Sequence, residues 1–129
     1  MRIVVDENLP PRLARALDDL FDEHEVTHLR TKFGPNFTDL EWIEALSAEG
    51  SWAVISSDRR ISRNKAELKA FKASRLVGFF FPKSLEKAKL TRKMERLMSI
   101  WDSLEAQVAL AAGGSMFEMP AKGSKFRTL

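Results

Sequence analysis

Ile3-Val4-Val5-Asp6 is an apolar run of β-branched residues that ends on an aspartate. Residues 52–58 repeat this pattern, because a second apolar run leads through two serines to Asp58. Continuous apolar runs of this length are typical of strands that are buried on both faces of a parallel sheet. If the two strands are neighbours, Asp6 and Asp58 meet at the edge where both strands end. The pattern therefore predicts a fold and a site together.

Helical spacing fills the stretches between the apolar runs. Strands are predicted at 2–6, 25–29, 52–57, 76–81 and 116–119, and helices after Asn8 and at 38–50, 64–73 and 84–112. Asn8 is predicted to cap the first helix, and residues 123–129 look like a polar tail. The alternation indicates an α/β fold: a three-layer α/β/α sandwich around a mainly parallel sheet of four or five strands. We expect residues 1–129 to form one domain.

Composition excludes several classes of chemistry. The 129 residues contain no cysteine, which rules out disulfides, thiolate catalysis and zinc sites built on cysteine. The first residues enter a predicted strand at once and show no signal-peptide pattern. No apolar run approaches the roughly 20 residues that span a bilayer. We therefore expect a cytoplasmic protein with no membrane partner.

Charge is distributed unevenly along the chain. Residues 1–58 hold five basic and twelve acidic residues, whereas residues 59–129 hold sixteen basic and six acidic ones. An acidic pocket that binds cations beside a basic surface suits a polyanion such as nucleic acid. The alternative is a set of solvated helix faces.

Three aspartates form the candidate metal site. In open parallel α/β sheets, ligands bind beyond the carboxyl ends of the strands, where the strand order reverses. Asp6 and Asp58 follow two such ends, and Asp39 could close the cluster from the start of a helix. Carboxylates that repel each other need a hard cation, which suggests Mg²⁺ or Mn²⁺ activating a water beside a phosphate. Alternatively, Asp6 and Asp58 are turn residues, and Asp39 and Glu41 only stabilise a helix N-terminus in a Thr38–Glu41 capping box.

Other polar residues surround these acids. Ser56 lies two residues before Asp58 and points to the same side of its strand, where it could orient a carboxylate. A basic segment follows at once, and its members could grip a phosphodiester backbone or form a solvated loop: Arg59, Arg60, Arg63 and Lys65. Trp42 and Trp52 could stack on bases, but core packing is the preferred interpretation. His24 and His28 are interpreted as structural.

These motifs resemble those of a known family. The run Asp6-Glu7-Asn8-Leu9-Pro10-Pro11-Arg12-Leu13-Ala14 resembles the opening of short PIN-like proteins that are toxin components of toxin–antitoxin systems. Ile55-Ser56-Ser57-Asp58 resembles their third-strand motif, and Thr38-Asp39-Leu40-Glu41 falls at their mid-chain acid. The resemblance covers residues 2–82.

The resemblance implies a metal-dependent ribonuclease with an α/β/α fold. Asp6, Asp39 and Asp58 would bind the metal, supported by Glu7, Asn8 and Ser56. The family's usual fourth acid has no assigned counterpart, because residues 60–83 offer only Glu67, which the Asn64-Lys65-Ala66-Glu67 pattern assigns to a helix cap.

We therefore expect a Mg²⁺- or Mn²⁺-dependent endoribonuclease, the toxin of a toxin–antitoxin pair. Its expected partners are an RNA substrate, an antitoxin protein and a second copy of the chain, the last from the long amphipathic helix and Phe79-Phe80-Phe81. One alternative is a non-catalytic PIN-like module that binds nucleic acid. Another is a receiver-like phosphoacceptor domain, although the chain contains no Lys-Pro pair.

Overall fold

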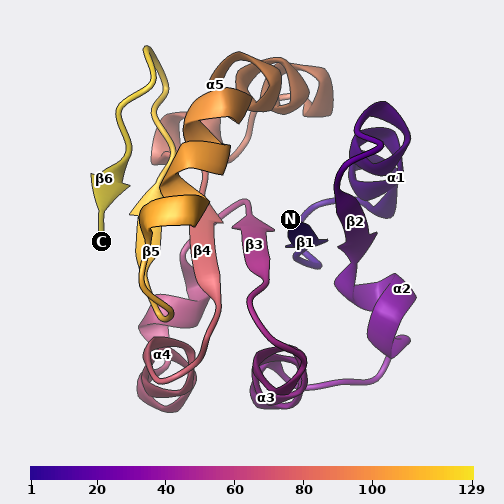
Figure 1. Ribbon diagram of the computed structural model, residues 1–129, viewed down its shortest axis with the longest axis vertical. Helices are drawn as coiled ribbons and strands as arrows, with labels where there is room; N and C mark the ends of the chain where they lie inside the picture. The colour runs from indigo at the N-terminus through magenta and orange to yellow at the C-terminus, as the bar shows by residue number, and fades with distance from the viewer.

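The computed structural model describes residues 1–129, which form one six-stranded sheet between helices (Figure 1). The strands are β1 (Arg2–Val5), β2 (Glu25–His28), β3 (Ala53–Ser56), β4 (Val77–Phe80), β5 (Met116–Glu118) and β6 (Arg127–Thr128). Their order is β2-β1-β3-β4-β5-β6; the first five are parallel and β6 runs antiparallel to β5. The predicted α/β/α class is confirmed, with one more strand than expected.

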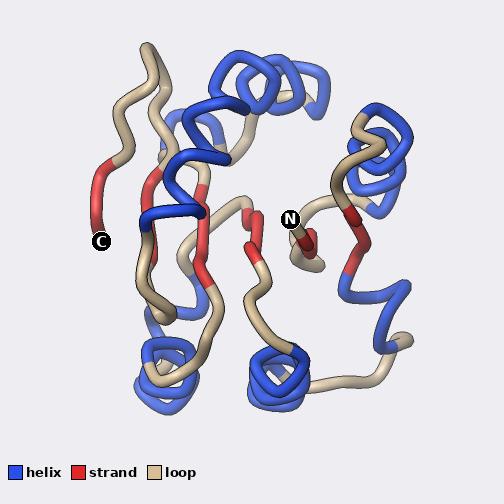
Figure 2. The backbone as a smooth tube through the Cα atoms, viewed as in Figure 1, coloured by secondary structure: helices blue, strands red, loops and turns tan.

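Helices cover both faces of this sheet (Figure 2). They are α1 (Pro11–Leu20), α2 (Leu29–Phe33), α3 (Asp39–Glu49), α4 (Lys65–Lys72) and α5 (Leu90–Leu110), with 3₁₀ turns η1 (Arg60–Arg63) and η2 (Lys83–Leu85). Ile3 and Val5 pack into the cluster under α1 and α5, whereas Val4 packs into the cluster under α3 and α4. Because successive side chains of a strand face opposite sides, every position of β3 and β4 and residues 3–5 of β1 are buried, which explains the continuous apolar runs. No helix is both long and apolar enough to cross a membrane.

The strand order reverses beside β1. The chain pairs β2 with one side of β1 and then crosses over to place β3 on the other side. In this register Val5 lies opposite Ile55, and the Asp6 N–H donates to the Ile55 carbonyl at 2.9 Å. The carboxyl ends of β1 and β3 are thus held side by side, where the sequence predicted the site.

One helix boundary and one strand boundary differ from the prediction. The helix predicted at 84–112 begins at Leu90, because the buried Leu85 first anchors a tight 3₁₀ turn at the end of the sheet. The predicted strand 25–29 ends at His28, whose ring Nδ1 accepts the Arg30 N–H at 3.0 Å and caps α2. A side chain from the strand thereby starts a short helix where a loop was expected.

The segment expected to be a polar tail is folded onto the sheet. Phe126 packs edge-on against Phe79 with ring centroids 5.6 Å apart, and Arg127–Thr128 form β6. Arg96 of α5 donates to the Ala121 carbonyl at 3.1 Å and holds the approach to this strand. The prediction of a polar tail at 123–129 was therefore wrong, since a single aromatic residue anchors it.

Candidate metal centre

Asp6 lies buried at the end of β1, with 8% of its surface exposed. Its Oδ1 accepts the Glu7 N–H at 2.7 Å and its Oδ2 accepts the Ser56 hydroxyl at 3.0 Å. Burial raises the pKa of Asp6 above its ordinary value; the two hydrogen bonds and the charge of Arg60 oppose this rise, and the charge of Asp39 adds to it. The protein thus holds a carboxylate where its negative charge is poorly compensated, as expected of a site that binds a cation.

Asn8 links the ends of β1 and β3 instead of capping α1. Its amide Nδ2 donates to Ser56 Oγ at 2.9 Å and lies 3.4 Å from Asp58 Oδ1, while its Oδ1 accepts the Ser57 N–H at 3.0 Å. The N-cap of α1 is Pro10, which makes no side-chain cap bond. The prediction that Asn8 caps the helix was therefore wrong, and its supporting place beside the acids follows from these long-range bonds.

Asp58 and Glu7 have unequal places around this centre. Asp58 Oδ1 accepts the Arg60 N–H at 2.9 Å, so Asp58 makes a turn, yet its Oδ2 has no protein donor and stays free for a ligand. The Glu7 side chain turns away from the acids, because its Oε1 lies 3.0 Å from Arg30 Nη2. Glu7 therefore supports the site only through its backbone N–H to Asp6.

The first turns of α3 and α4 bring two further carboxylates to the same edge. The capping box of Thr38 and Glu41 forms as predicted, so the cap does not need Asp39. Asp39 Oδ1 instead accepts the Trp42 indole N–H at 2.8 Å. Partial burial, the negative charge of Asp39 and a hydrogen bond with it raise the pKa of Glu67, and the charge of Arg60 opposes this. Glu67 thus favours its protonated form more than an ordinary glutamate does.

Glu67 does not form the helix cap to which its sequence pattern assigned it. Asn64 Oδ1 alone accepts the N–H groups of Ala66 and Glu67, and the Glu67 carboxyl does not return to the cap. The order of helices and strands could have indicated from the sequence that Glu67 lies near the other acids. Helices that connect parallel strands run back along the sheet, so they begin at the edge where the strands end, and an acid in their first turn can lie near the strand-end acids.

The donor set fits a hard divalent cation. Carboxylates of Asp6, Asp39, Asp58 and Glu67 and the amide of Asn8 are oxygen ligands, which Mg²⁺ and Mn²⁺ prefer. No three of these acids, however, present ligand atoms within 4.8 Å of one another. Such spacing suits an ion held by one or two direct carboxylates and waters, as is usual for Mg²⁺.

A different trio does lie within 4.8 Å: Glu23, His24 and Glu105. His24 Nε2 is 3.2 Å from Glu105 Oε1 and 3.7 Å from Glu23 Oε1. His24 directly precedes β2, so this trio lies where the parallel strands begin, at the edge opposite Asp6. It is therefore separate from the acidic centre.

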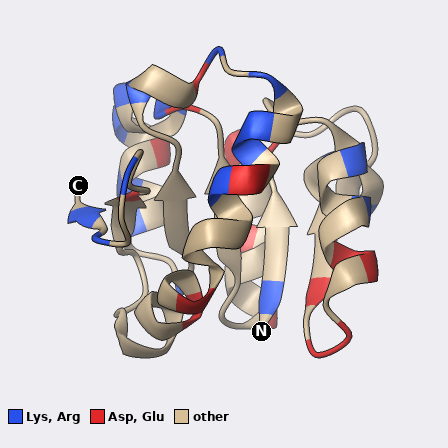
Figure 3. Cartoon of the chain, turned by 90° about the horizontal axis from the view of Figure 1, so that it is seen from above, with Lys and Arg blue, Asp and Glu red and all other residues tan.

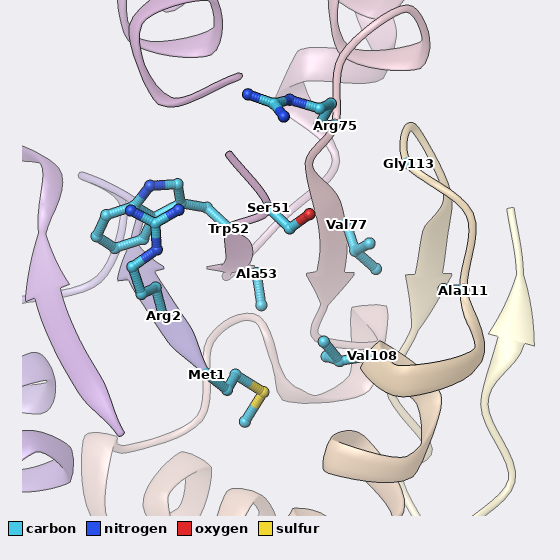
Figure 4. Close-up of a pocket in the computed structure, with 10 residues that line it drawn as sticks. All are labelled: Met1, Arg2, Ser51, Trp52, Ala53, Arg75, Val77, Val108, Ala111 and Gly113. Carbon is cyan, nitrogen blue, oxygen red and sulfur yellow. The ribbon is translucent and has the colours of Figure 1, made fainter. Parts of the chain in front are cut away.

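A hollow of about 370 Å³ also lies at that opposite edge (Figure 4). Two of its arginines bind the carboxyl end of α3: Arg2 donates to the Glu49 carbonyl at 3.1 Å and Arg75 to the Ser47 carbonyl at 2.9 Å. Trp52 is buried beneath the Arg2 guanidinium, 4.9 Å from the centre of its ring. These contacts stabilise a helix end and keep Trp52 in the core, as the sequence favoured.

The four basic residues predicted to bind nucleic acid divide into two kinds. Arg63 and Lys65 are exposed and make no ion pair, whereas Arg59 lies 3.6 Å from Glu118 and Arg60 lies 3.6 Å from Asp39. A hollow of about 310 Å³ beside η1 is lined by Arg59, Ser62, Arg63, Lys83 and Glu86. Figure 3 shows basic segments gathered toward the end of the molecule to which the strand arrows point.

A parallel α/β/α sheet with acids at its reversal point defines a class of domains that handle phosphates with the help of a metal. The model of the PIN-like domain family matches residues 1–83, and the chain belongs to this family. The match contains β1 to β4 and all four acids. PIN-like domains have a nuclease-type fold, are generally nucleases and are typically metal-dependent. No curated protein and no solved structure matches the chain.

Proposed function

We propose that the chain is a Mg²⁺- or Mn²⁺-dependent endoribonuclease and the toxin component of a toxin–antitoxin system. One observation carries the catalytic part: four carboxylates from β1, α3, the end of β3 and α4 face one sheet edge beside an exposed basic segment. Carboxylates gathered at one edge repel each other and favour a bound cation, and adjacent Arg and Lys side chains suit a polyanionic substrate.

The chain's own residues have separate roles in this reaction. Asp6 and Asp58 would hold the ion, and Ser56 and Asn8 fix those two carboxylates relative to each other. When bound, a divalent ion supplies an activated water and neutralises charge on the scissile phosphate. Water adds across one P–O bond, and the leaving oxygen takes a proton. Glu67, whose pKa is raised, is suited to carry that proton.

The basic residues would position the RNA. Arg63 and Lys65 are exposed and unpaired, so they can bind phosphodiester oxygens directly. The toxin role rests on the sequence resemblance, and the antitoxin would cover the basic segment and occupy the acidic centre. Phe79, Phe80 and Phe81 are all buried within the chain, so a homodimer would need another surface, such as the outer side of α5.

Cleavage of a 5′-labelled single-stranded RNA tests the proposal. We expect Mn²⁺ or Mg²⁺ to support cleavage and EDTA to abolish it. Asp6→Asn and Asp58→Asn should each lower the rate by more than about 100-fold, because losing a metal ligand costs more than the roughly 10–100-fold that follows from losing a residue that only orients a ligand. Asp102→Asn is the matched control, since Asp102 is exposed on α5 and makes no hydrogen bond or ion pair. Full activity in Asp6→Asn or Asp58→Asn refutes the proposal.

The spacing of the acids, no three of which present ligand atoms within 4.8 Å of one another, favours one second candidate, a PIN-like module that binds nucleic acid without cleaving it. This candidate predicts RNA binding that persists in EDTA and no cleavage with any divalent metal. The same RNA and the same four proteins, compared by binding and by cleavage, distinguish the two functions. Membership of the PIN-like family leaves the receiver-like alternative without support.

A further inference from the structure

Arg60 contacts the acidic centre with both its backbone and its side chain. Its N–H donates to Asp58 Oδ1 at 2.9 Å, and its Nη2 lies 3.6 Å from Asp39 Oδ1. The side chain therefore crosses from η1 to the first turn of α3. Its charge also reaches the two remaining acids, because it lowers the pKa of both Asp6 and Glu67. All four carboxylates are thus bound, paired or stabilised by one arginine.

The neighbouring basic side chains do not share this position. Arg59 is paired with Glu118, and Arg63 makes no ion pair. No other Lys or Arg lies within 4.0 Å of the four acids. Arg60 is also 56% exposed, and exposed ion pairs contribute little stability, so this side chain can leave Asp39 at small cost.

We propose that Arg60 serves as the internal cation of the metal-free site, and that its side chain moves from Asp39 to an RNA phosphate when a divalent ion binds. The guanidinium and a divalent ion would bind the same carboxylate oxygens. Because two cations at this range repel each other, only one of them can be held at a time. The planar guanidinium can bind a phosphate in bidentate fashion once it is free. This inference rests on the proposed metal-dependent function and adds that metal and Arg60 exclude each other at Asp39.

Competition predicts that the variant binds the metal more tightly, a change that removal of a metal ligand cannot produce. Removing a ligand weakens metal binding, whereas removing an internal competitor strengthens it. Arg60→Ala should therefore bind Mn²⁺ about twofold to fivefold more tightly than the wild type, a factor that matches the modest strength of an exposed ion pair. The backbone bond from residue 60 to Asp58 survives in this variant, so the turn after β3 keeps its anchor.

Isothermal titration with Mn²⁺ in the absence of RNA measures this effect on the full chain. Arg63→Ala is the matched control, because Arg63 ends the same 3₁₀ turn but pairs with no acid; its Mn²⁺ affinity should equal that of the wild type. Asp39→Asn should bind Mn²⁺ more weakly. Equal affinity in Arg60→Ala and Arg63→Ala, or weaker binding by Arg60→Ala, overturns the inference.

A phosphorothioate RNA that resists hydrolysis tests the second half of the movement. We expect Arg60→Ala to bind this RNA about threefold to tenfold more weakly than the wild type in Mn²⁺ and to lose less in EDTA, since Arg60 must then leave Asp39 to reach the RNA. Arg63→Ala should lose the same factor in both conditions. An equal loss for Arg60→Ala in EDTA and Mn²⁺ refutes the movement.

The two proposals can fail separately. If the wild type binds no Mn²⁺, both the proposed function and this inference fail. If Asp6→Asn weakens Mn²⁺ binding but Arg60→Ala leaves it unchanged, the metal site stands and only the competition by Arg60 is refuted.

Discussion

Ser56→Ala should reveal how much the hydroxyl at the end of β3 contributes to the acidic centre. Ser56 is 2% exposed, and its single proton has two acceptors at 3.0 Å, Asp6 Oδ2 and the Asp58 carbonyl. It also accepts a hydrogen bond from the Asn8 amide at 2.9 Å. A bond to a charged group contributes about 1.5–3 kcal/mol and a neutral one about 1 kcal/mol. Because the exposed Asn8 regains a bond from water, we expect a loss of about 2–3 kcal/mol in the free energy of unfolding.

Urea unfolding of the metal-free protein at two pH values measures this loss. The Ser56 hydrogen bond lowers the pKa of Asp6, so it stabilises the charged carboxylate. The destabilisation by Ser56→Ala should therefore be full at neutral pH and smaller at about pH 3, where Asp6 is protonated. Ser99→Ala is the control, because its exposed hydroxyl only bonds the Glu95 carbonyl within α5; its effect should stay within about 0.5 kcal/mol. A Ser56→Ala effect that is below 0.5 kcal/mol, or identical at both pH values, refutes the reasoning.

Three further variants test the charge balance of the site and its support from α5. Because the pKa of Asp6 is raised in the folded state, the stability linked to its protonation is present below the unfolded pKa and is lost as pH rises through the folded pKa. Asp6→Asn should therefore stabilise the metal-free protein at neutral pH. Urea titrations should show that this gain vanishes in acid. Glu67→Gln should stabilise the metal-free protein in the same direction while weakening Mn²⁺ binding at least threefold by calorimetry, whereas a structural cap would give destabilisation and unchanged binding. Lys93→Met should lower RNA cleavage about tenfold without lowering the content of helix measured by circular dichroism. The reason is that Nζ of the buried Lys93 donates to Ser57 Oγ at 3.2 Å, beside Asp58. Unchanged cleavage would mean that this bond does not position the turn.

The parts of the fold that the sequence predicted are those that depend on local pattern and strand order. Two apolar runs ending on Asp6 and Asp58 predicted a shared edge if the two strands are parallel neighbours, and β1 does pair with β3 in this way. The Thr38–Glu41 capping box was also correct, since both of its hydrogen bonds join residues three apart. Such features need no knowledge of what packs nearby.

The failures are residues whose local motif had a competing partner far along the chain. Asn8 matched a helix cap, but Ser56 and Ser57 of the neighbouring strand bind its amide, and both serines lie more than 40 positions away. Glu67 matched a capping box, but Asn64 satisfies the cap alone, and the Glu67 carboxyl lies near Asp39 instead. Phe126 similarly turned a polar-looking tail into an edge strand. A sequence motif indicates which hydrogen bonds a residue can form, and its neighbours in the folded chain determine which of them form.

The acidic centre also depends on residues outside the family match. The match ends at residue 83, yet the matched strands present Ile3, Val5 and Phe79 on the face that α5 covers. Side chains such as Leu97, fully buried in the same cluster, remove this face from water. From the same helix, Lys93 donates a hydrogen bond to Ser57. Ser57 lies between Ser56, which binds Asp6, and Asp58, whose Oδ2 is free. The matched segment therefore supplies the acids, and α5 supplies both the second apolar layer and a buried charge that fixes the turn carrying Asp58. Because the two contributions meet in three consecutive residues, the chemistry of this site belongs to the whole chain and not to the matched segment alone.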